Sequence, residues 1–324
     1  MPRILVTGAN GFIGRKLLPL LVASGMTVRA TSRQAPTEPV RGIEAWPEVD
    51  LTDGDARLVD LCRDCHAVVH LAGLAHDSTA TAESSDASNH GVTRCLARAA
   101  AAAGVERFLY LSTIKVCGEG QAAGQEHAYS ESDPPAPGDA YARSKWAAEQ
   151  ALQAVCETSG MDYTIIRPPL VYGPGVKANF LALLRLVGTG LPLPLGSIRN
   201  RRSMIFVDNL CDLLVRALNA PAAAGRTYHA ADITFSTPEL IRCIAGAMDM
   251  GARLLPCPPV ILKVLGSLSG RWSTANRLLG SLVVDDSHVR RELAWKPPVP
   301  VSTAMRQTAE WYLSGRSAEQ GGSQ

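Results

Sequence analysis

Short apolar runs alternate with longer helical patterns through the first half of the chain. The runs have the length and the β-branched or aromatic content of buried strands, and they occupy residues 4–6, 27–31, 67–71, 108–111 and 163–166. Helical patterns lie between them, at 15–24, 86–104 and 142–157. This order predicts an α/β fold in which a doubly wound parallel sheet (a Rossmann fold) is covered by helices on both faces.

After about residue 170 the pattern becomes less regular, and Pro and Gly are frequent. A strand is predicted at 205–207, followed by a helix at 210–218 that Asp208 would cap. Thr237-Pro238-Glu239 is typical of another helix start. We therefore expect a Rossmann domain over 1–170 and a smaller substrate-binding domain over 171–313, parts of which return to the first domain. The polar, Gly/Ser-rich end, 314–324, predicts a disordered tail.

Composition and charge narrow the class of protein. The 324 residues carry a formal net charge of +2, which gives no electrostatic reason to expect nucleic acid as a partner. No apolar stretch is long enough for a membrane span, and no signal pattern precedes the strand at 4–6, so a cytoplasmic protein is expected. Cys62-Arg-Asp-Cys65-His66 matches a haem-attachment pattern, but it leads directly into an apolar strand and has no second cysteine pair. It predicts packing at a helix end and free thiols, with no metal site.

A glycine-rich turn joins the first strand to the first helix. Its sequence is Thr7-Gly8-Ala9-Asn10-Gly11-Phe12-Ile13-Gly14. Such glycines permit a tight turn, the close approach of a phosphate to the backbone, and close packing of helix on strand. The helix N-terminus adds N–H groups and partial positive charge. The turn therefore predicts a dinucleotide site.

The end of the second strand bears on which dinucleotide binds. A site specific for NAD places Asp or Glu near this point, to bind the ribose 2′-hydroxyl. This chain has Ser32-Arg33 instead, which suits a 2′-phosphate and favours NADP(H), with NAD(H) as the alternative. Asp50 and Leu51, after the next loop, are expected beside the adenine.

Tyr141 and Lys145 begin the helix at 142–157 and lie four residues apart. Positions i and i+4 share one helix face, so the phenol and the ammonium should project the same way. A neighbouring cation favours the phenolate, so we expect a lowered pKa for Tyr141 and a role in proton exchange with a sugar or alcohol hydroxyl. Ser112 and Thr113 end a strand, at the edge of the sheet where ligands bind in such folds.

These motifs together resemble the extended short-chain dehydrogenase/reductases, in particular the nucleotide-sugar epimerase/dehydratase group. The resemblance covers residues 4 to about 312. It is carried by Thr7-Gly8-x-x-Gly11-x-x-Gly14, Asp50-Leu51, His70-Leu71-Ala72-Gly73, Ser112-Thr113, Tyr141-x-x-x-Lys145, Arg167-Pro168-x-x-Val171-Tyr172-Gly173-Pro174, Arg202-x-x-x-x-Val207-Asp208 and Leu293-Ala294-Trp295-Lys296-Pro297.

The resemblance implies a role for individual residues. Tyr141 would be the acid/base, Lys145 would tune it and hold the nicotinamide ribose, and Ser112 or Thr113 would bind the reacting hydroxyl or carbonyl. Further cofactor contacts are implied at Leu71, Ala72, Gly73, Asn89 and Pro168. Nucleotide-sugar contacts are implied at Lys115, Asn179, Arg202 and Arg277. The helices at 86–104 and 141–157 resemble those that form a homodimer interface in this family.

One departure from the family pattern bears on the reaction. Sugar 4,6-dehydratases carry an Asp-Glu pair after the strand-end Ser/Thr, where this chain has Ile114-Lys115, so dehydration is disfavoured. The loop 111–119 resembles a subgroup from surface-polysaccharide loci. With Ser32-Arg33, it favours an NADPH-dependent reductase of a UDP-4-keto-6-deoxy-N-acetylhexosamine. A UDP-sugar 4-epimerase is the alternative. A non-catalytic NADP(H)-sensing protein and an NADPH ketoreductase of a non-nucleotide substrate rank lower.

Overall fold

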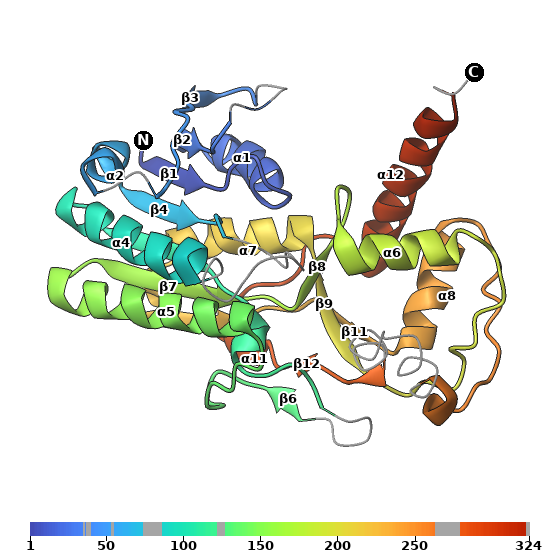
Figure 1. Cartoon of the computed structure of the whole chain (residues 1–324). Helices are drawn as coiled ribbons and strands as arrows, with labels where there is room; N and C mark the ends of the chain where they lie inside the picture. Colours follow the sequence, from blue (N-terminus) through green and yellow to red (C-terminus); the bar gives the residue numbers. More distant parts are fainter. Residues whose placement is uncertain are drawn as a thin grey trace.

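The computed structural model consists of a larger α/β part and a smaller part beside it (Figure 1). It describes residues 1–34, 36, 40–52, 55–73, 86–121, 127–262 and 279–321, with side chains described up to residue 315. The larger part contains the N-terminus, and the smaller part carries the C-terminal helix (Figure 1).

A seven-stranded sheet, parallel throughout, is the centre of the larger part. Its strand order is β10-β7-β5-β4-β1-β2-β3. The order reverses direction between β1 and β4, where a doubly wound sheet binds its ligand. The predicted Rossmann sheet is thereby confirmed. The strands are β1 (Arg3–Thr7), β2 (Thr27–Thr31), β3 (Ile43–Ala45), β4 (Ala67–His70), β5 (Arg107–Leu111), β7 (Asp162–Arg167) and β10 (Arg226–His229).

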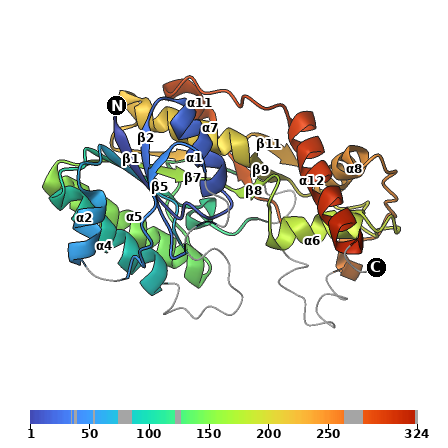
Figure 2. The ribbon, with the colours of Figure 1, turned by 90° about the horizontal axis from the view of Figure 1, so that it is seen from above.

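Alternate residues of each strand point to opposite faces of the sheet, and both faces are apolar. Val6, Val69 and Leu109 belong to one hydrophobic core, whereas Val68 and Phe108 belong to the other. One core contains the helices α1 (Gly14–Ala23) and α7 (Val207–Asn219), and the other contains α2 (Asp55–Cys62), α4 (Val92–Ala102) and α5 (Ala140–Ser159). Figure 2 shows the two helix layers on either side of the strands.

The smaller part is built on a three-stranded sheet. Its order is β11-β9-β8, with β11 antiparallel to β9. The strands are β8 (Leu170–Tyr172), β9 (Arg202–Phe206) and β11 (Ile233–Phe235), and the helices are α6 (Ala178–Val187), α8 (Thr237–Ala247) and α12 (Val301–Gly321). A two-stranded ribbon, β6 (Ala128–Tyr129) with β12 (Val283–Val284), and the helix α11 (Ser287–Glu292) lie below (Figure 1). Short turns η1 (Ala87–Gly91), η2 (Ile114–Val116) and η3 (Pro221–Ala223) complete the described elements.

Two details differ from the sequence-based expectations. Asp208 does not cap α7: the N-cap residue is Phe206, and Asp208 lies inside the first helical turn, 3.9 Å from Lys16 Nζ. The helix α12 continues to Gly321, so that most of the stretch 314–324, where we expected a disordered tail, is helical; residues 322–324 lie outside the described residues. Ala, Arg, Glu and Gln in this stretch are good helix formers, and their polarity does not oppose a helix. The helix predicted at Thr237 is confirmed, with Ser236 and Glu239 forming a capping box.

Segments after residue 170 return to the main sheet, through the edge strand β10 and the covering helix α7. Among the described helices, none has both the length and the apolar composition that crossing a bilayer requires.

Candidate active site

The turn between β1 and α1 leaves no room for a side chain at Gly8 or Gly14. Gly8 has a φ of +68°, and a Cβ added there would lie 2.7 Å from the backbone nitrogen of Ala72. A Cβ at Gly14 would lie 2.5 Å from the carbonyl oxygen of Gly8. The turn is closed by a hydrogen bond of 2.9 Å from the Gly11 N–H to the Gly8 carbonyl. Backbone atoms therefore form the surface of the turn, which is what a pyrophosphate needs in order to approach it.

A cavity of about 710 Å³ opens over this turn, at the carboxyl ends of β1, β2 and β4. Its size suits a bound cofactor. Many residues predicted to bind the dinucleotide line it, namely Gly8, Asn10, Gly11, Ser32, Arg33, Asp50, Leu51, Leu71, Ala72 and Gly73. The sequence did not single out other lining residues, among them Thr31, Gln34, Val49, Thr52, Ser88 and Val92.

The polar side chains of the cavity wall that follow β2 and β3 differ in how many hydrogen bonds hold them. The Ser32 hydroxyl donates to the Gln34 carbonyl at 2.5 Å and accepts a hydrogen bond of 2.7 Å from Trp46 Nε1. Asp50 accepts hydrogen bonds from the Thr52 backbone and hydroxyl, at 3.0 and 2.8 Å, and these bonds lower its pKa. Arg33 is exposed and lines the cavity. A cationic side chain thus lies on the cavity wall just after β2.

Lys145, on the helix α5, lies next to Gly73 of the cavity wall. Its side chain is 4% exposed, and its Nζ donates a hydrogen bond of 2.9 Å to the Leu111 carbonyl and lies 4.6 Å from the centre of the Tyr110 ring. A Cβ added at Gly73, on the cavity wall, would lie 3.2 Å from this Nζ. Burial lowers the pKa of Lys145 to about 8, against an opposing effect of Glu149.

The expected lowering of the Tyr141 pKa is wrong, because the pKa is raised. Burial raises the pKa of the phenol, and the negative charge of Asp139 raises it further. Tyr141 and Lys145 do begin the same helix, which Asp139 caps by accepting a hydrogen bond of 2.7 Å from the Ala142 N–H. However, the Lys145 ammonium is directed to the Leu111 carbonyl.

Ser112 and Thr113 have different surroundings. Ser112 is buried and donates a short hydrogen bond to Glu149. Thr113 is 9% exposed, and its hydroxyl accepts a weak hydrogen bond of 3.3 Å from the Lys115 N–H at the start of η2. Because the Ser112 proton is committed to a carboxylate, Thr113 has the hydroxyl that is better placed to serve a ligand.

The residues expected to contact the nucleotide sugar are spread over several elements. Lys115 Nζ forms ion pairs with Asp139 at 2.6 Å and Glu119 at 3.2 Å, close to the start of α5. Asn179 is exposed in the first turn of α6, and Arg202 begins β9 and donates to the Gly280 carbonyl at 3.1 Å. Arg277 lies outside the described residues.

Polar residues between β4 and α5 form a buried framework behind the cavity. His70 contacts the hydroxyls of Thr7 at 2.6 Å and Thr93 at 3.1 Å, and burial lowers its pKa to about 3, so it is neutral. Asn89 lies in the π-helical turn η1 and donates a hydrogen bond of 3.0 Å to the Ser144 hydroxyl. A Cβ at Gly73 would lie 2.6 Å from Asn89 Oδ1. This framework fixes Gly73 against α5.

The remaining predicted cofactor contacts lie around this site. Phe12 and Ile13 are half-buried between the glycines of the turn, and the buried Pro168 accepts a hydrogen bond of 3.0 Å from the Ile114 N–H. Sequence reasoning missed Glu149 and gave no role to Arg167, which form a buried ion pair beside Ser112. The signal for Glu149 was its place four residues after Lys145, on the buried face of the same helix.

Comparison with known proteins agrees with this geometry. Residues 4–231 match the model of the NAD dependent epimerase/dehydratase family. A UDP-glucose 4-epimerase of Vibrio cholerae is 37% identical over 330 residues, an alignment that covers 98% of each chain.

Solved structures share the fold. A short-chain dehydrogenase/reductase superfamily protein of Agrobacterium tumefaciens with bound NAD has a TM-score of 0.78, at 21% identity, and the match covers 98% of this chain and 99% of that one. MoeE5 in complex with UDP-glucuronic acid and NAD has a TM-score of 0.76, at 24% identity, covering 97% and 99%. From its motifs, its fold and its match to the family model, this chain is a member of the NAD-dependent epimerase/dehydratase family.

Proposed function

We propose that the protein oxidises and reduces C4 of a UDP-linked sugar, and that it is a UDP-sugar 4-epimerase. The observation that carries the proposal is the contiguity of the site: Gly73 belongs to the wall of the dinucleotide cavity and lies against Lys145, one turn after Tyr141. The 37% identity to a UDP-glucose 4-epimerase over nearly the full length of both chains supports this choice of reaction.

The residues of the cavity fit a nicotinamide dinucleotide. Gly8, Gly11 and Gly14 would hold the pyrophosphate against the backbone, Asp50 and Leu51 would flank the adenine, and Lys145 would bind the nicotinamide ribose. When bound, the nicotinamide supplies reversible hydride transfer at a carbon that bears a hydroxyl.

Side chains of the protein would transfer the proton and orient the sugar. Tyr141 would take the proton of the C4 hydroxyl and return it, and Thr113 would hydrogen-bond the same oxygen. The raised pKa of Tyr141 keeps the phenol protonated, so it is ready to donate in the reduction step, and it must lose this proton before it can act as the base in the oxidation step. Asn179 and Arg202 would bind the diphosphate, since a guanidinium donates two parallel hydrogen bonds to it.

Dehydration is not favoured by this site. Ile114 is 2% exposed and packs in a small apolar cluster, and Lys115 is engaged by two carboxylates. Neither can provide the carboxylic acid and carboxylate of a sugar 4,6-dehydratase.

A second candidate is an NADPH-dependent reductase of a UDP-4-keto-6-deoxy-N-acetylhexosamine. Such an enzyme would act in the cytoplasm, in the synthesis of surface polysaccharide. Arg33 on the cavity wall supports it, because a cation there suits the 2′-phosphate of a cofactor that is exchanged at every turnover. An epimerase keeps its cofactor and needs no such exchange.

By analogy with the family, α4 and α5 would form the interface of a homodimer.

One assay separates the two candidates. Purified protein is incubated with UDP-glucose or UDP-N-acetylglucosamine without added cofactor, and in parallel with NADPH and a UDP-4-keto-6-deoxy-N-acetylhexosamine. The proposal predicts interconversion of the 4-epimers in the first reaction, abolished by Tyr141→Phe while cofactor affinity is retained. Loss of nicotinamide absorbance in the second reaction alone would establish the reductase, and inactivity in both would refute C4 chemistry.

A further inference from the structure

Tyr141, Lys145 and Glu149 follow one another at intervals of four residues, so they lie on one face of α5. Glu149 is completely buried, and its two oxygens are occupied by the Arg167 guanidinium, at 3.0 Å from Nε and 2.5 Å from Nη2. The Ser112 hydroxyl donates to the same carboxylate. A buried carboxylate with this full set of donors is ionised and fixed in position.

Two polar contacts join the end of β5 to α5. Lys145 Nζ donates to the carbonyl of Leu111, and Ser112 donates to Glu149 one helical turn further on. Thr113, which the proposed function places at the reacting oxygen, is the next residue of the chain. Movement of Glu149 would therefore move both the strand end and the ammonium of Lys145.

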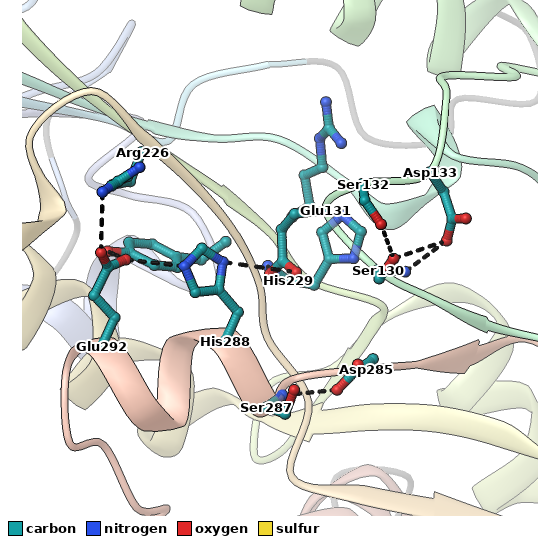
Figure 3. A network of polar contacts seen from close by, with 12 residues as sticks. Ser130, Glu131, Ser132, Asp133, Arg226, His229, Asp285, Ser287, His288 and Glu292 are labelled. Atoms are coloured by element: carbon teal, nitrogen blue, oxygen red, sulfur yellow. Dashed lines mark hydrogen bonds and ion pairs between the residues drawn. The ribbon is translucent and has the colours of Figure 1, made fainter.

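Arg167 is held on its other side as well. Its Nη1 lies 3.4 Å from the sulfur of Cys117, which lies 3.6 Å from Nε2 of His229. The backbone N–H of His229 donates to Glu131 at 2.7 Å, and Glu131 lies between His229 and His288 in Figure 3. Burial lowers the pKa of His229, which keeps its ring neutral. Of the charged groups described here, Glu149 and Arg167 are the two that form a buried ion pair.

We infer that Glu149, clamped by Arg167, is a positioning residue that anchors the end of β5 to α5 and supplies the counter-charge of Lys145. Two other groups beside the ammonium are uncharged, namely the Tyr110 ring and the neutral His70 of β4. The inference rests on the proposed function only in taking Lys145 as the residue that holds the cofactor.

The charge of Glu149 has a measurable consequence in the ligand-free protein. An adjacent carboxylate favours the protonated ammonium, so it raises the pKa of Lys145 against the lowering by burial. Removing the negative charge must move the titration of Lys145 to lower pH. A merely structural contact would change stability and leave that titration where it is.

The test uses protein labelled with ¹³C at the lysine ε-carbons, titrated by NMR in the wild type, in Glu149→Gln and in the double variant Glu149→Gln/Arg167→Met. The Lys145 signal is assigned by its loss in Lys145→Met, among signals from Lys16, Lys115, Lys145, Lys177, Lys263 and Lys296. The double variant avoids an unpaired buried guanidinium, and replacement of a whole buried ion pair by uncharged residues is often tolerated. Glu157→Gln, the same substitution at an exposed site of α5, is the matched control.

The wild type and Glu157→Gln should titrate near pH 8, where burial and Glu149 together place Lys145. In Glu149→Gln the midpoint should fall by about one pH unit or more, the range of a close charge. In the double variant it should fall by less, because the loss of the Arg167 cation offsets part of the loss of the Glu149 charge. A folded Glu149→Gln variant whose Lys145 midpoint equals that of the wild type would overturn the inference, as would a double variant whose midpoint does not lie below that of the wild type. The titration needs no substrate, so failure of the UDP-sugar assay would leave this result unaffected.

Discussion

At the scale of single residues, the site depends on which of two neighbouring hydroxyls is free. Ser112 and Thr113 both follow β5 directly, and sequence reasoning could not choose between them because the choice is made by Glu149, 37 residues after Ser112. The same reasoning misjudged the Tyr141 pKa, because a sequence shows the spacing of a cation but not the burial that opposes it. Residues that act through local backbone shape, such as Gly8, were predictable.

The two hydroxyls can be told apart by substitution. Thr113→Val should lower the turnover of the UDP-sugar about 100-fold, or roughly 2.7 kcal/mol, since it removes a hydrogen bond at the reacting oxygen. Thr113→Ser is the control, because it keeps that hydroxyl. Ser112→Ala should retain most of the activity and lose roughly 1–3 kcal/mol of stability, because Glu149 loses a buried donor. Measured kcat and unfolding free energies would refute the assignment if Ser112→Ala proved the less active variant.

At the scale of elements, the strand–turn–helix unit that opens the chain and the helix α5 position the chemistry. These units were predictable because their signals are local: an apolar run, glycines at fixed intervals, and a helix ended by Gly160 in the left-handed conformation. The π-helical turn η1, which brings Asn89 to Ser144, was not predictable, since its geometry depends on packing against α5. Neither was the paired arrangement of Glu149 with Arg167 on β7.

The glycine turn can be tested with a matched pair of substitutions. Gly8 and Gly25 both have positive φ, +68° and +78°, but only a Cβ at Gly8 would meet other atoms within 4 Å. Gly25→Ala should lose roughly 1 kcal/mol from backbone strain alone. Gly8→Ala should lose more, and should weaken NAD binding at least about tenfold, because Ala72 has to move. Equal effects of the two substitutions on stability and on calorimetric NAD affinity would argue against a cofactor cradle at this turn.

At the scale of the whole molecule, a single hydrophobic core crosses from the Rossmann sheet into the smaller part. It includes Leu17 of α1, Leu214 of α7, Ile244 of α8 and Tyr312 of α12. The sequence suggested a boundary near residue 170, since the regular alternation ends there. Long-range contacts, which leave little local signal, carry β10 and α7 back to the first part.

This shared core predicts one cooperative unfolding transition. Heating should give coincident midpoints for backbone circular dichroism and tryptophan fluorescence, and NAD should raise both together. A fragment of residues 1–170 should not fold, because it lacks the edge strand β10 and the helix α7. Two separated transitions, of which only the first responds to NAD, would show that the two parts fold independently.

A UDP-sugar 4-epimerase oxidises its substrate at C4, and the hydrogen of C4 is carried and returned within one active site. The most direct test of this assignment is to supply UDP-glucose deuterated at C4 and to examine the UDP-galactose formed by NMR. We predict that the deuterium remains at C4 of the epimer, and that Tyr141→Phe forms no labelled product. Release of the deuterium to water, or inversion at any other carbon, would contradict the account.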